Sequence, residues 1–287
     1  MIISKAQFLN NFSGHDVSTF NEFMDTYSVR IRNTMSPLKD YVARKHISKQ
    51  ALETLYNHIV DKDKYLSRFY NTSLSVSGDI HIKEEPMKRE YMNNNKNVNY
   101  KNIIRNIHYE DILQNTYSGI ENNPTFMKVL YDLYINRIID YKILTPSAIH
   151  YILEGRIGSV FSSFYFRASI MNPYLVYSLN KSLLKGTKVF TPTLGWSSYA
   201  YGFMECDEII EYVGTDVIKN VCSKTRTLLR ENYNHNQFKI FQSPSENLMK
   251  NKEFRVKYNS YFDLVFFSPP YFKMEMYPGD KQSTTNY

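Results

Sequence analysis

Small, polar and proline-rich residues recur at four points in the second half of the sequence, and each point directly follows a short apolar run. The first is the turn at residues 192–198, the second is Asp216, and the third and fourth are the segments 243–246 and 268–271. If the runs are parallel strands, these residues lie at the carboxyl edge of one sheet, where open α/β sheets bind ligands. The spacing therefore predicts one binding site built from four strand ends.

The residue types at the first three points suit a nucleoside-like ligand. Gly195 and the small hydroxyl residues around it give a turn at which the backbone can approach a ligand closely. Asp216 follows about 20 residues later, and its carboxylate suits a bidentate grip on ribose hydroxyls. Ser245 and Glu246 add polar groups that can hydrogen-bond an adenine edge.

Each of these features also has an ordinary structural explanation. A lone Gly-Trp-Ser sequence around Gly195 is usually a plain turn, and an Asp after a strand often caps the following helix. The Ser-Pro-Ser-Glu sequence at 243–246 matches a capping box, and the double proline at 269–270 can simply end a strand. Four such features in order, each at a strand end, are better explained by a common site.

The elements that must position these residues are short strands alternating with helices. After Gly186 the β-rich runs are KVFTPTL (188–194), EYVGTDV (211–217), FKIFQS (238–243) and FDLVFFS (262–268). Helical segments, such as the one at 217–232, lie between them. Strands that alternate with helices form βαβ units with a parallel sheet, so the predicted fold class is α/β.

The sequence before this part predicts helices. Ser48 is a candidate N-cap, and the apolar residues of 123–141 have helical spacing. The stretch at about 83–106 is rich in Asn and Lys and predicts a long loop. We therefore expect a mainly α-helical N-terminal region at 1–145 and an α/β core at 146–287.

From about residue 155 to 287 the chain resembles the S-adenosylmethionine-dependent amino-methyltransferases of DNA, which modify adenine N6 or cytosine N4. Their signature at the end of the fourth strand is Asp/Asn/Ser-Pro-Pro-Tyr/Phe, and it is matched by SPPY at 268–271. EYVGTDV matches the second-strand acid, IFQSPSENL matches the third strand, and FSSFYFRASIMNPYLVYSL is similar to the element that precedes the cofactor loop. VFTPTLGWSSYAYG stands where the family has Asp-Pro-x-x-Gly-x-Gly. The whole arrangement looks most like methyltransferases of large DNA viruses and phages.

This resemblance implies a Rossmann-like methyltransferase core, and it implies catalytic roles for Ser268, Pro269, Pro270 and Tyr271. The Ser268 hydroxyl and the Pro269 carbonyl would accept the two amino hydrogens of the base and aim the nitrogen lone pair at the methyl group. The prolines fix that carbonyl and remove competing N–H donors. Tyr271 would stack on a base taken out of the duplex. No metal and no covalent intermediate are needed.

The resemblance also implies S-adenosyl-L-methionine as the cofactor. Gly195 and its neighbours would pass close to the methionine part, Asp216 would bind the ribose hydroxyls, and Ser245 or Glu246 would bind the adenine. Arg167 or Asn172 would contact the cofactor carboxylate. The cofactor-binding residues implied are Thr191, Pro192, Gly195, Trp196, Asp216, Ser245, Glu246 and Arg167.

The sequence departs from the family pattern in its cofactor loop and in its strand count. The leading Asp of the loop is Thr191 here, and the second Gly is Ser197. The family sheet has about seven strands, whereas four are found before residue 287. By analogy these four lie in the order 3-2-1-4, which leaves the fourth as an exposed apolar edge that invites pairing. We expect either a truncated chain, a homo- or hetero-partner that completes the sheet, or a degenerate relative.

Composition and charge favour an intracellular, soluble protein with a polyanionic partner. The net charge is +7 and the pI is about 9.1, with five Lys or Arg against one acid in residues 151–200. Solvated lysines on an ordinary surface give the same sum. Cys206 and Cys222 lack zinc-ligand spacing and cannot build a disulfide scaffold. No run is long enough for a signal peptide or a membrane span, and we expect a cytoplasmic or nuclear location, including that of a viral protein in a host cell.

Two functional hypotheses from different classes follow. The first is a DNA methyltransferase acting on cytosine N4 or adenine N6, with RNA or a protein glutamine as other acceptors. The second is a catalytically inactive binding or assembly protein that keeps the fold, for which Thr191 and the missing strands are the evidence. An ordinary dinucleotide-dependent dehydrogenase is disfavoured, because a Gly-x-Gly-x-x-Gly motif is absent.

Overall fold

A computed structural model of the chain describes residues 2–14, 17–120, 123–233 and 237–277. Its helices are α1 (Lys5–Asn10), α2 (Phe20–Thr26), α3 (Leu38–Lys45), α4 (Lys49–Val60), α5 (Lys62–Ser73), α6 (Asn99–Ile107), α7 (Phe126–Tyr134), α8 (Pro146–Leu153), α9 (Ile157–Tyr165), α10 (Pro173–Leu179), α11 (Ser198–Met204), α12 (Lys219–Asn232), α13 (Ser245–Lys250) and α14 (Lys252–Tyr258). Its strands are β1 (Ser28–Ile31), β2 (Thr34–Pro37), β3 (Ile138–Asp140), β4 (Lys188–Thr191), β5 (Glu211–Asp216), β6 (Gln237–Gln242) and β7 (Leu264–Val265). Short 3-10 or π turns are η1 (Arg89–Tyr91), η2 (Glu110–Gln114), η3 (Tyr141–Leu144), η4 (Asn180–Leu184) and η5 (Phe272–Met274).

The C-terminal half is built around a parallel sheet, which confirms the predicted α/β class. The described strands lie in the order β6-β5-β4-β7, and all three neighbouring pairs are parallel. This is the predicted order 3-2-1-4, with the fourth strand at the edge. Because the strands are parallel, their carboxyl ends meet at one edge of the sheet.

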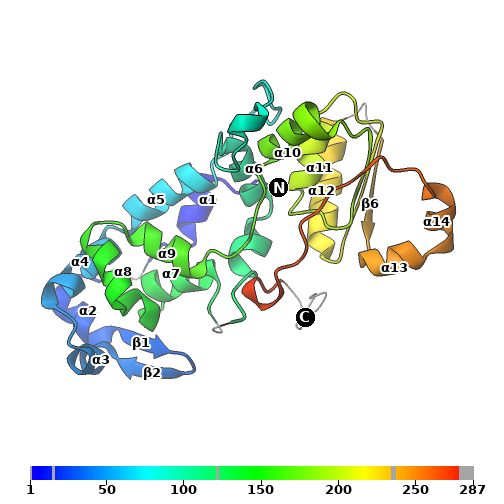
Figure 1. The fold of residues 1–287 in the computed structure, drawn as a ribbon. Helices are drawn as coiled ribbons and strands as arrows, with labels where there is room; N and C mark the ends of the chain where they lie inside the picture. Colours follow the sequence, from blue (N-terminus) through cyan, green and yellow to red (C-terminus); the bar gives the residue numbers. More distant parts are fainter. Residues whose placement is uncertain (1, 15–16, 121–122, 234–236, 278–287) are drawn as a thin grey trace.

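Helices cover both faces of this sheet, as in other parallel sheets that are buried on both sides. On one face α10, α11 and α12 extend the large core, and on the other α13 and α14 enclose a smaller aromatic cluster (Figure 1). The smaller cluster joins Phe190 and Val213 of the sheet to Leu248, Phe254 and Tyr258. The edge strand β7 is less well covered, since Val265 is 55% and the nearby Phe267 is 52% exposed.

The N-terminal half is mainly helical, but it also contains a three-stranded sheet that the sequence did not predict. Its order is β2-β1-β3, with β1 antiparallel to β2 and parallel to β3. Residues 123–141 were predicted to be helical throughout, yet α7 ends at Tyr134 and β3 begins at Ile138. Arg137, with φ of 58°, breaks the helical backbone between them.

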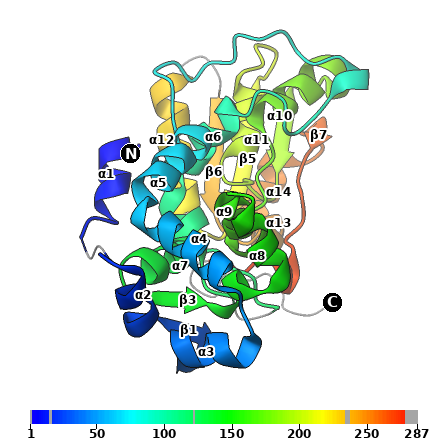
Figure 2. The same cartoon turned by 90° about the vertical axis from the view of Figure 1, so that its left-hand side faces the viewer.

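The predicted loop at 83–106 is also wrong in its last part, where α6 forms from residue 99 onward. Tyr100, Ile103, Ile104 and Ile107 recur at helical spacing and are all buried. The loop was predicted because Asn and Lys residues stand between these apolar positions and dominate the composition of the stretch. This helix packs against α10, which covers one face of the sheet (Figure 2). It therefore connects the N-terminal half to the C-terminal half.

The packing does not separate the two halves after residue 145. Helices α8 and α9, predicted to begin the core, pack against α4 and α7 of the N-terminal half. One continuous hydrophobic cluster runs from Phe8 in α1 to Ile240 in β6. The segment 166–172, between α9 and α10, therefore marks the passage from one half to the other.

Candidate functional site

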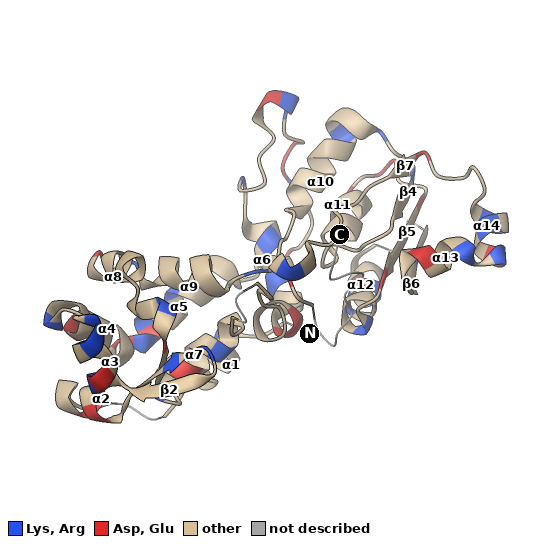
Figure 3. Ribbon diagram, turned by 60° about the horizontal axis from the view of Figure 1, so that its bottom comes forward, with Lys and Arg blue, Asp and Glu red and all other residues tan. Residues whose placement is uncertain are grey.

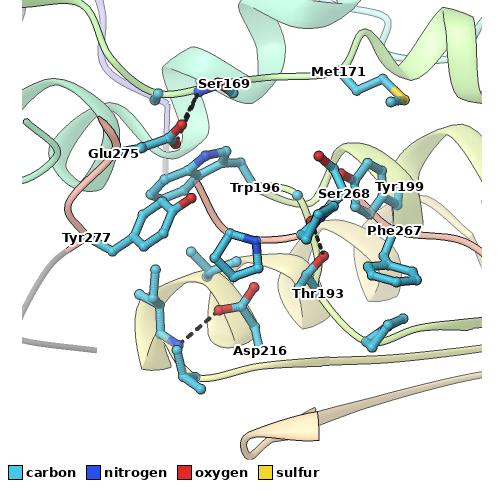
Figure 4. A pocket seen from close by; sticks show the side chains of 18 of the residues that line it. Ser169, Met171, Thr193, Trp196, Tyr199, Asp216, Phe267, Ser268, Glu275 and Tyr277 are labelled. Atoms are coloured by element: carbon cyan, nitrogen blue, oxygen red, sulfur yellow. Dashed lines mark hydrogen bonds between the residues drawn. The ribbon is translucent and has the colours of Figure 1, made fainter. Parts of the chain in front are cut away.

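A cavity of about 1340 Å³ lies at the carboxyl edge of the sheet. Its lining includes residues that follow all four strands, together with α6, the segment 166–171 and the segment 275–277. Figure 4 shows Glu275 and Tyr277 at one end of the cavity, Tyr199 and Phe267 at the other, and Asp216 below. The predicted gathering of the four strand ends at one place is confirmed by this lining.

The turn between β4 and α11 has an unusual backbone. Gly195, Trp196 and Ser197 have φ values of 53°, 60° and 70°, so three consecutive residues are left-handed. Such a conformation is costly for residues other than glycine and persists only where the surroundings enforce it. The turn lies directly after the first strand of the sheet, and Gly195 and Trp196 line the cavity.

Glycine is required at position 195 for space as well as for conformation. A Cβ atom there would meet the ring of Tyr199 at 2.5–2.8 Å. Gly155 also has a positive φ, of 72°, but an added Cβ there would meet nothing within 4 Å. The two glycines therefore separate the steric effect from the conformational one.

We expect Gly195→Ala to destabilise the protein by about 2–4 kcal/mol and Gly155→Ala by about 1 kcal/mol, because only the first adds a clash to the left-handed strain. Denaturant unfolding of the two variants and the wild type measures the difference. Equal losses of stability in both variants would show that Tyr199 does not pack tightly on the turn.

A buried polar network that joins His108 of the N-terminal half to Thr225 of α12 holds this turn. The Ser197 hydroxyl lies 2.7 Å from Nε2 of His108 and 2.6 Å from the hydroxyl of Thr225. His108 is fully buried, and burial together with Lys224 lowers its pKa to about 3, so the ring is neutral at ordinary pH. Ser197 thus stabilises the left-handed turn through its side chain.

Asp216, at the end of β5, connects this turn to the next helix. Its Oδ2 accepts a hydrogen bond from the Leu194 N–H at 3.1 Å, and its Oδ1 accepts one from the Ile218 N–H at 3.0 Å. Burial raises the pKa of Asp216, and this effect outweighs the lowering of the pKa by the backbone N–H donors. An ionised carboxylate has about four acceptor positions, so the side chain retains acceptor capacity toward the cavity that it lines. The helix-capping explanation and the ligand-binding one are both compatible with this geometry.

The segment 243–246, which follows β6, lines the cavity. It does not form the capping box that its Ser-Pro-Ser-Glu sequence suggested. Pro244 is the N-cap of α13, with no side-chain cap, and the Ser243 hydroxyl instead donates to the Pro244 carbonyl. Ser245 and Glu246 both line the cavity. Their side chains are consequently not used to cap the helix.

The Ser268–Tyr271 segment after β7 forms the fourth part of the lining. The Ser268 hydroxyl lies 2.8 Å from the Tyr271 hydroxyl, and the Thr193 hydroxyl donates to the Ser268 carbonyl at 3.4 Å. Ser268 also hydrogen-bonds to Tyr199, whose pKa burial raises to about 12. Among the described residues, none donates a hydrogen bond to the Pro269 carbonyl.

Glu275 joins the segment after β7 to the segment that precedes α10. Both of its carboxylate oxygens accept from the Ser169 N–H, at 3.1 and 3.2 Å, and its side chain also hydrogen-bonds to Trp196 and Tyr277. It is 2% exposed, and burial raises its pKa to about 7. Glu275 therefore holds the two segments that close one end of the cavity.

The raised pKa of Glu275 predicts a pH dependence of stability. Between about pH 4.5 and 7 the folded protein keeps a proton on this carboxyl that the unfolded chain releases, so stability should fall as the pH rises. The expected loss is about 3–4 kcal/mol at most, since each pKa unit corresponds to about 1.4 kcal/mol.

Unfolding free energies measured from pH 4.5 to 8 test this dependence. Glu275→Gln should flatten it, whereas Glu253→Gln, at an exposed position on α14, should not. If Glu275→Gln shows the same pH dependence of stability as the wild type, Glu275 is not the group responsible for it.

Ten of the twelve predicted site residues line this cavity: Pro192, Gly195, Trp196, Asp216, Ser245, Glu246, Ser268, Pro269, Pro270 and Tyr271. Thr191 does not, because it is fully buried and its hydroxyl is hydrogen-bonded to that of Tyr212. Arg167 does not either, and its Nη2 donates to the Phe164 carbonyl instead. The cofactor contacts implied for these two residues are not supported by the geometry.

Other lining residues were missed by the sequence reasoning, namely Lys101, Arg105, Thr193, Tyr199 and Glu275. Lys101 and Arg105 come from α6, whose Asn- and Lys-rich sequence predicts a loop. Tyr199 and Glu275 follow predicted motifs by only a few residues, but only the folded chain places them in the cavity.

No group of three or more His, Cys, Asp or Glu side chains in the described part of the chain is placed to hold a metal ion. Cys206 and Cys222 are both buried, and burial raises the pKa of each thiol to about 12. Within the described ranges, no helix combines the length and the apolar character needed to span a membrane. Comparisons of the chain with protein-family models, with curated proteins and with solved structures gave no match.

Proposed function

We propose that this protein transfers the methyl group of S-adenosylmethionine to an exocyclic amino group of a DNA base, cytosine N4 or adenine N6. The observation that carries the proposal is the convergence of four strand-end segments on one cavity. They are the left-handed turn at 195–197, Asp216, the 243–246 segment and the Ser-Pro-Pro-Tyr segment at 268–271. Their order along the sheet edge is that of the resembled family.

The residues present fit an adenosyl cofactor. Asp216 offers its remaining acceptor positions to ribose hydroxyls, and Ser245 and Glu246 lie beyond it, at the end of β6. Gly195 lines the cavity, and the space that a side chain there would take is filled by the ring of Tyr199. When bound, S-adenosylmethionine would supply a methyl group on a sulfonium whose sulfur leaves as a neutral thioether, so no metal is required.

Ser268 and Pro269 would activate the amino group. A hydroxyl has one donor and two acceptor positions, so Ser268 can donate to Tyr199, accept from Tyr271 and still accept one amino hydrogen. The Pro269 carbonyl accepts the other. Holding both hydrogens directs the nitrogen lone pair at the methyl carbon. The bound cofactor would supply the methyl group, with its sulfur leaving as a neutral thioether, and the methylated amine would lose one proton to water.

Phe267 is a candidate stacking surface for the base. It is 52% exposed, and it lines the cavity next to Ser268. A base must leave the duplex to reach such a site, and stacking on an aromatic ring offsets part of that cost. The resemblance assigned stacking to Tyr271, whose hydroxyl is engaged with Ser268.

The alternative proposal, an inactive protein of the same fold, is favoured by one observation. Thr191 stands where the family has its leading acid, and it points away from the cavity into a hydrogen bond with Tyr212. The cofactor would therefore lose a contact that the family uses. Cofactor binding separates the two functions, because only the first requires it.

Calorimetric titration of the purified protein with S-adenosylmethionine tests the proposal. Binding with a micromolar Kd, which corresponds to about 8 kcal/mol, is expected for the enzyme. Absence of binding to a protein shown to be folded would favour the inactive alternative.

A further inference from the structure

Two basic side chains from the N-terminal half line the same cavity. Lys101 and Arg105 stand four residues apart on α6, which places them on one face of the helix. Figure 3 shows the blue segments of α6 between the N-terminal helices and the sheet. The part of the cavity lining that α6 contributes is therefore positively charged.

These two cations have no acidic partner among the described residues. Two other half-buried cations do have acidic partners, since Arg30 pairs with Asp132 and Asp140, and Lys224 pairs with Glu110 and Asp111. The Lys101 ammonium forms no hydrogen bond or ion pair within the described ranges.

Arg105 has only neutral contacts. Its Nη1 donates to the Asn102 side chain at 3.1 Å, and its guanidinium lies over the Phe166 ring at 5.3 Å. Its Nε is buried without a hydrogen-bond partner. The guanidinium therefore has a donor that no group in the described part of the chain satisfies.

This arrangement is unfavourable unless an anion binds there. Like charges one helical turn apart repel each other, and partial burial removes the water that would stabilise them. Burial and the nearby Arg105 lower the pKa of Lys101 to about 8, and burial also lowers the pKa of Arg105. A bound anion would relieve the repulsion and satisfy the free donor.

We propose that Lys101 and Arg105 bind the phosphodiester of the nucleotide that carries the target base. This inference rests on the proposed function and narrows its substrate to nucleic acid, which excludes a protein glutamine. A guanidinium presents paired donors that match phosphate oxygens, and an ammonium adds a second charge. The α6 helix thus forms a substrate-binding wall.

The cofactor carboxylate is the less suitable anion for these two residues. S-adenosylmethionine carries an ammonium and a sulfonium besides its carboxylate, so its net charge is positive, and the acids of this cavity (Asp216, Glu246 and Glu275) suit it better. A nucleic acid strand carries one negative charge per nucleotide. The cavity, at about 1340 Å³, exceeds the roughly 300–1000 Å³ of most single-ligand sites and leaves room for a base beside the cofactor.

Binding of a fluorescent single-stranded DNA oligonucleotide, measured by anisotropy over a range of salt concentrations and without cofactor, tests the inference. Lys101→Ala and Arg105→Ala should each weaken binding about tenfold, as expected when a charge-assisted hydrogen bond is lost. Each should also lower the slope of log K against log salt by about one. The matched control is Lys64→Ala, at an exposed position on α5, which removes the same charge and should change affinity less than twofold.

Separate titrations with S-adenosylmethionine distinguish the two anions. Unchanged cofactor affinity in both variants supports the phosphodiester assignment, and weakened cofactor binding with unchanged oligonucleotide binding overturns it. So does a wild-type protein that binds no oligonucleotide. Because each substitution removes the repulsion between Lys101 and Arg105, the Tm of each variant should be no lower than that of the wild type. Such a result excludes misfolding as the cause of weaker oligonucleotide binding. Oligonucleotide binding that depends on Lys101 and Arg105 would stand even if methyl transfer were not found.

Discussion

Asp216→Ala should weaken S-adenosylmethionine binding by at least about 100-fold. The proposed role of this carboxylate is to accept hydrogen bonds from both ribose hydroxyls, and hydrogen bonds to a charged group contribute about 1.5–3 kcal/mol each. Loss of two such bonds exceeds the roughly 2.7 kcal/mol that corresponds to 100-fold. Calorimetric titration of the wild type and the variant measures the ratio directly.

The same substitution also affects the fold, and a second variant separates the two effects. The Leu194 and Ile218 N–H groups lose their acceptor in Asp216→Ala, which should lower stability by about 2–4 kcal/mol. Asp216→Asn keeps one acceptor oxygen, so it should lose less stability while still weakening cofactor binding at least about tenfold. Asp207→Ala, at a fully exposed acid, is the charge-matched control. Wild-type affinity in Asp216→Ala would exclude the ribose role.

Ser268→Ala should lower the rate of methyl transfer about 100-fold and leave cofactor affinity within about twofold. The lost acceptor acts mainly in the transition state, where removal of one positioned hydrogen-bonding group costs about 100-fold or more in other enzymes. Single-turnover transfer to DNA, with cofactor titration alongside, separates the two effects. A parallel loss of cofactor binding would indicate that Ser268 supports the cavity and does not act on the amine.

Two further variants test whether the rate loss in Ser268→Ala comes from the Ser268 hydroxyl itself. Tyr271→Phe keeps the ring and removes only the hydroxyl that contacts Ser268, so it should reduce the rate about fivefold or less. Ser223→Ala, at an exposed position on α12, is the matched serine control and should have no effect. A rate loss in Tyr271→Phe as large as that in Ser268→Ala would move the catalytic role to the tyrosine hydroxyl.

The parts of the fold that the sequence could predict are those with local signals. Each strand of the parallel sheet is a compact β-rich run, and each is followed by turn residues, so the strands could be predicted from these signals, whereas their order was predicted from the family resemblance. The polar residues after those strands then had to share one edge, and ten of the twelve named residues line one cavity.

The parts that could not be predicted depend on contacts between distant residues. Strand β3 is three residues long and pairs with β1, about 110 residues earlier, so its own sequence has too few positions to show alternation. The left-handed turn at Ser197 depends on His108, nearly 90 residues away. The unpaired cations of α6 become visible only when the helix is placed against the cavity, because sequence alone does not show which charges lack partners.

Residues near the motifs can also be misassigned when only their type is considered. Thr191 occupies the motif position of an acid, but a hydroxyl at the end of a buried strand can bond within the core, as it does to Tyr212. Arg167 lies in a segment that borders the cavity, yet its guanidinium donates to a backbone carbonyl of its own chain segment. Glu275 is a buried acid that lines the cavity and hydrogen-bonds to Trp196, and it was not identified as a site residue from sequence.

Incubation of the protein with DNA and S-adenosylmethionine labelled in its methyl group, followed by digestion to nucleosides, tests the proposed chemistry most directly. Label in N4-methylcytosine or N6-methyladenine, absent from the Ser268→Ala reaction, is the result that methyl transfer at this cavity predicts. A folded protein that leaves all bases unlabelled while binding the cofactor and the oligonucleotide would contradict it, since every group required for the transfer would then be present without the reaction.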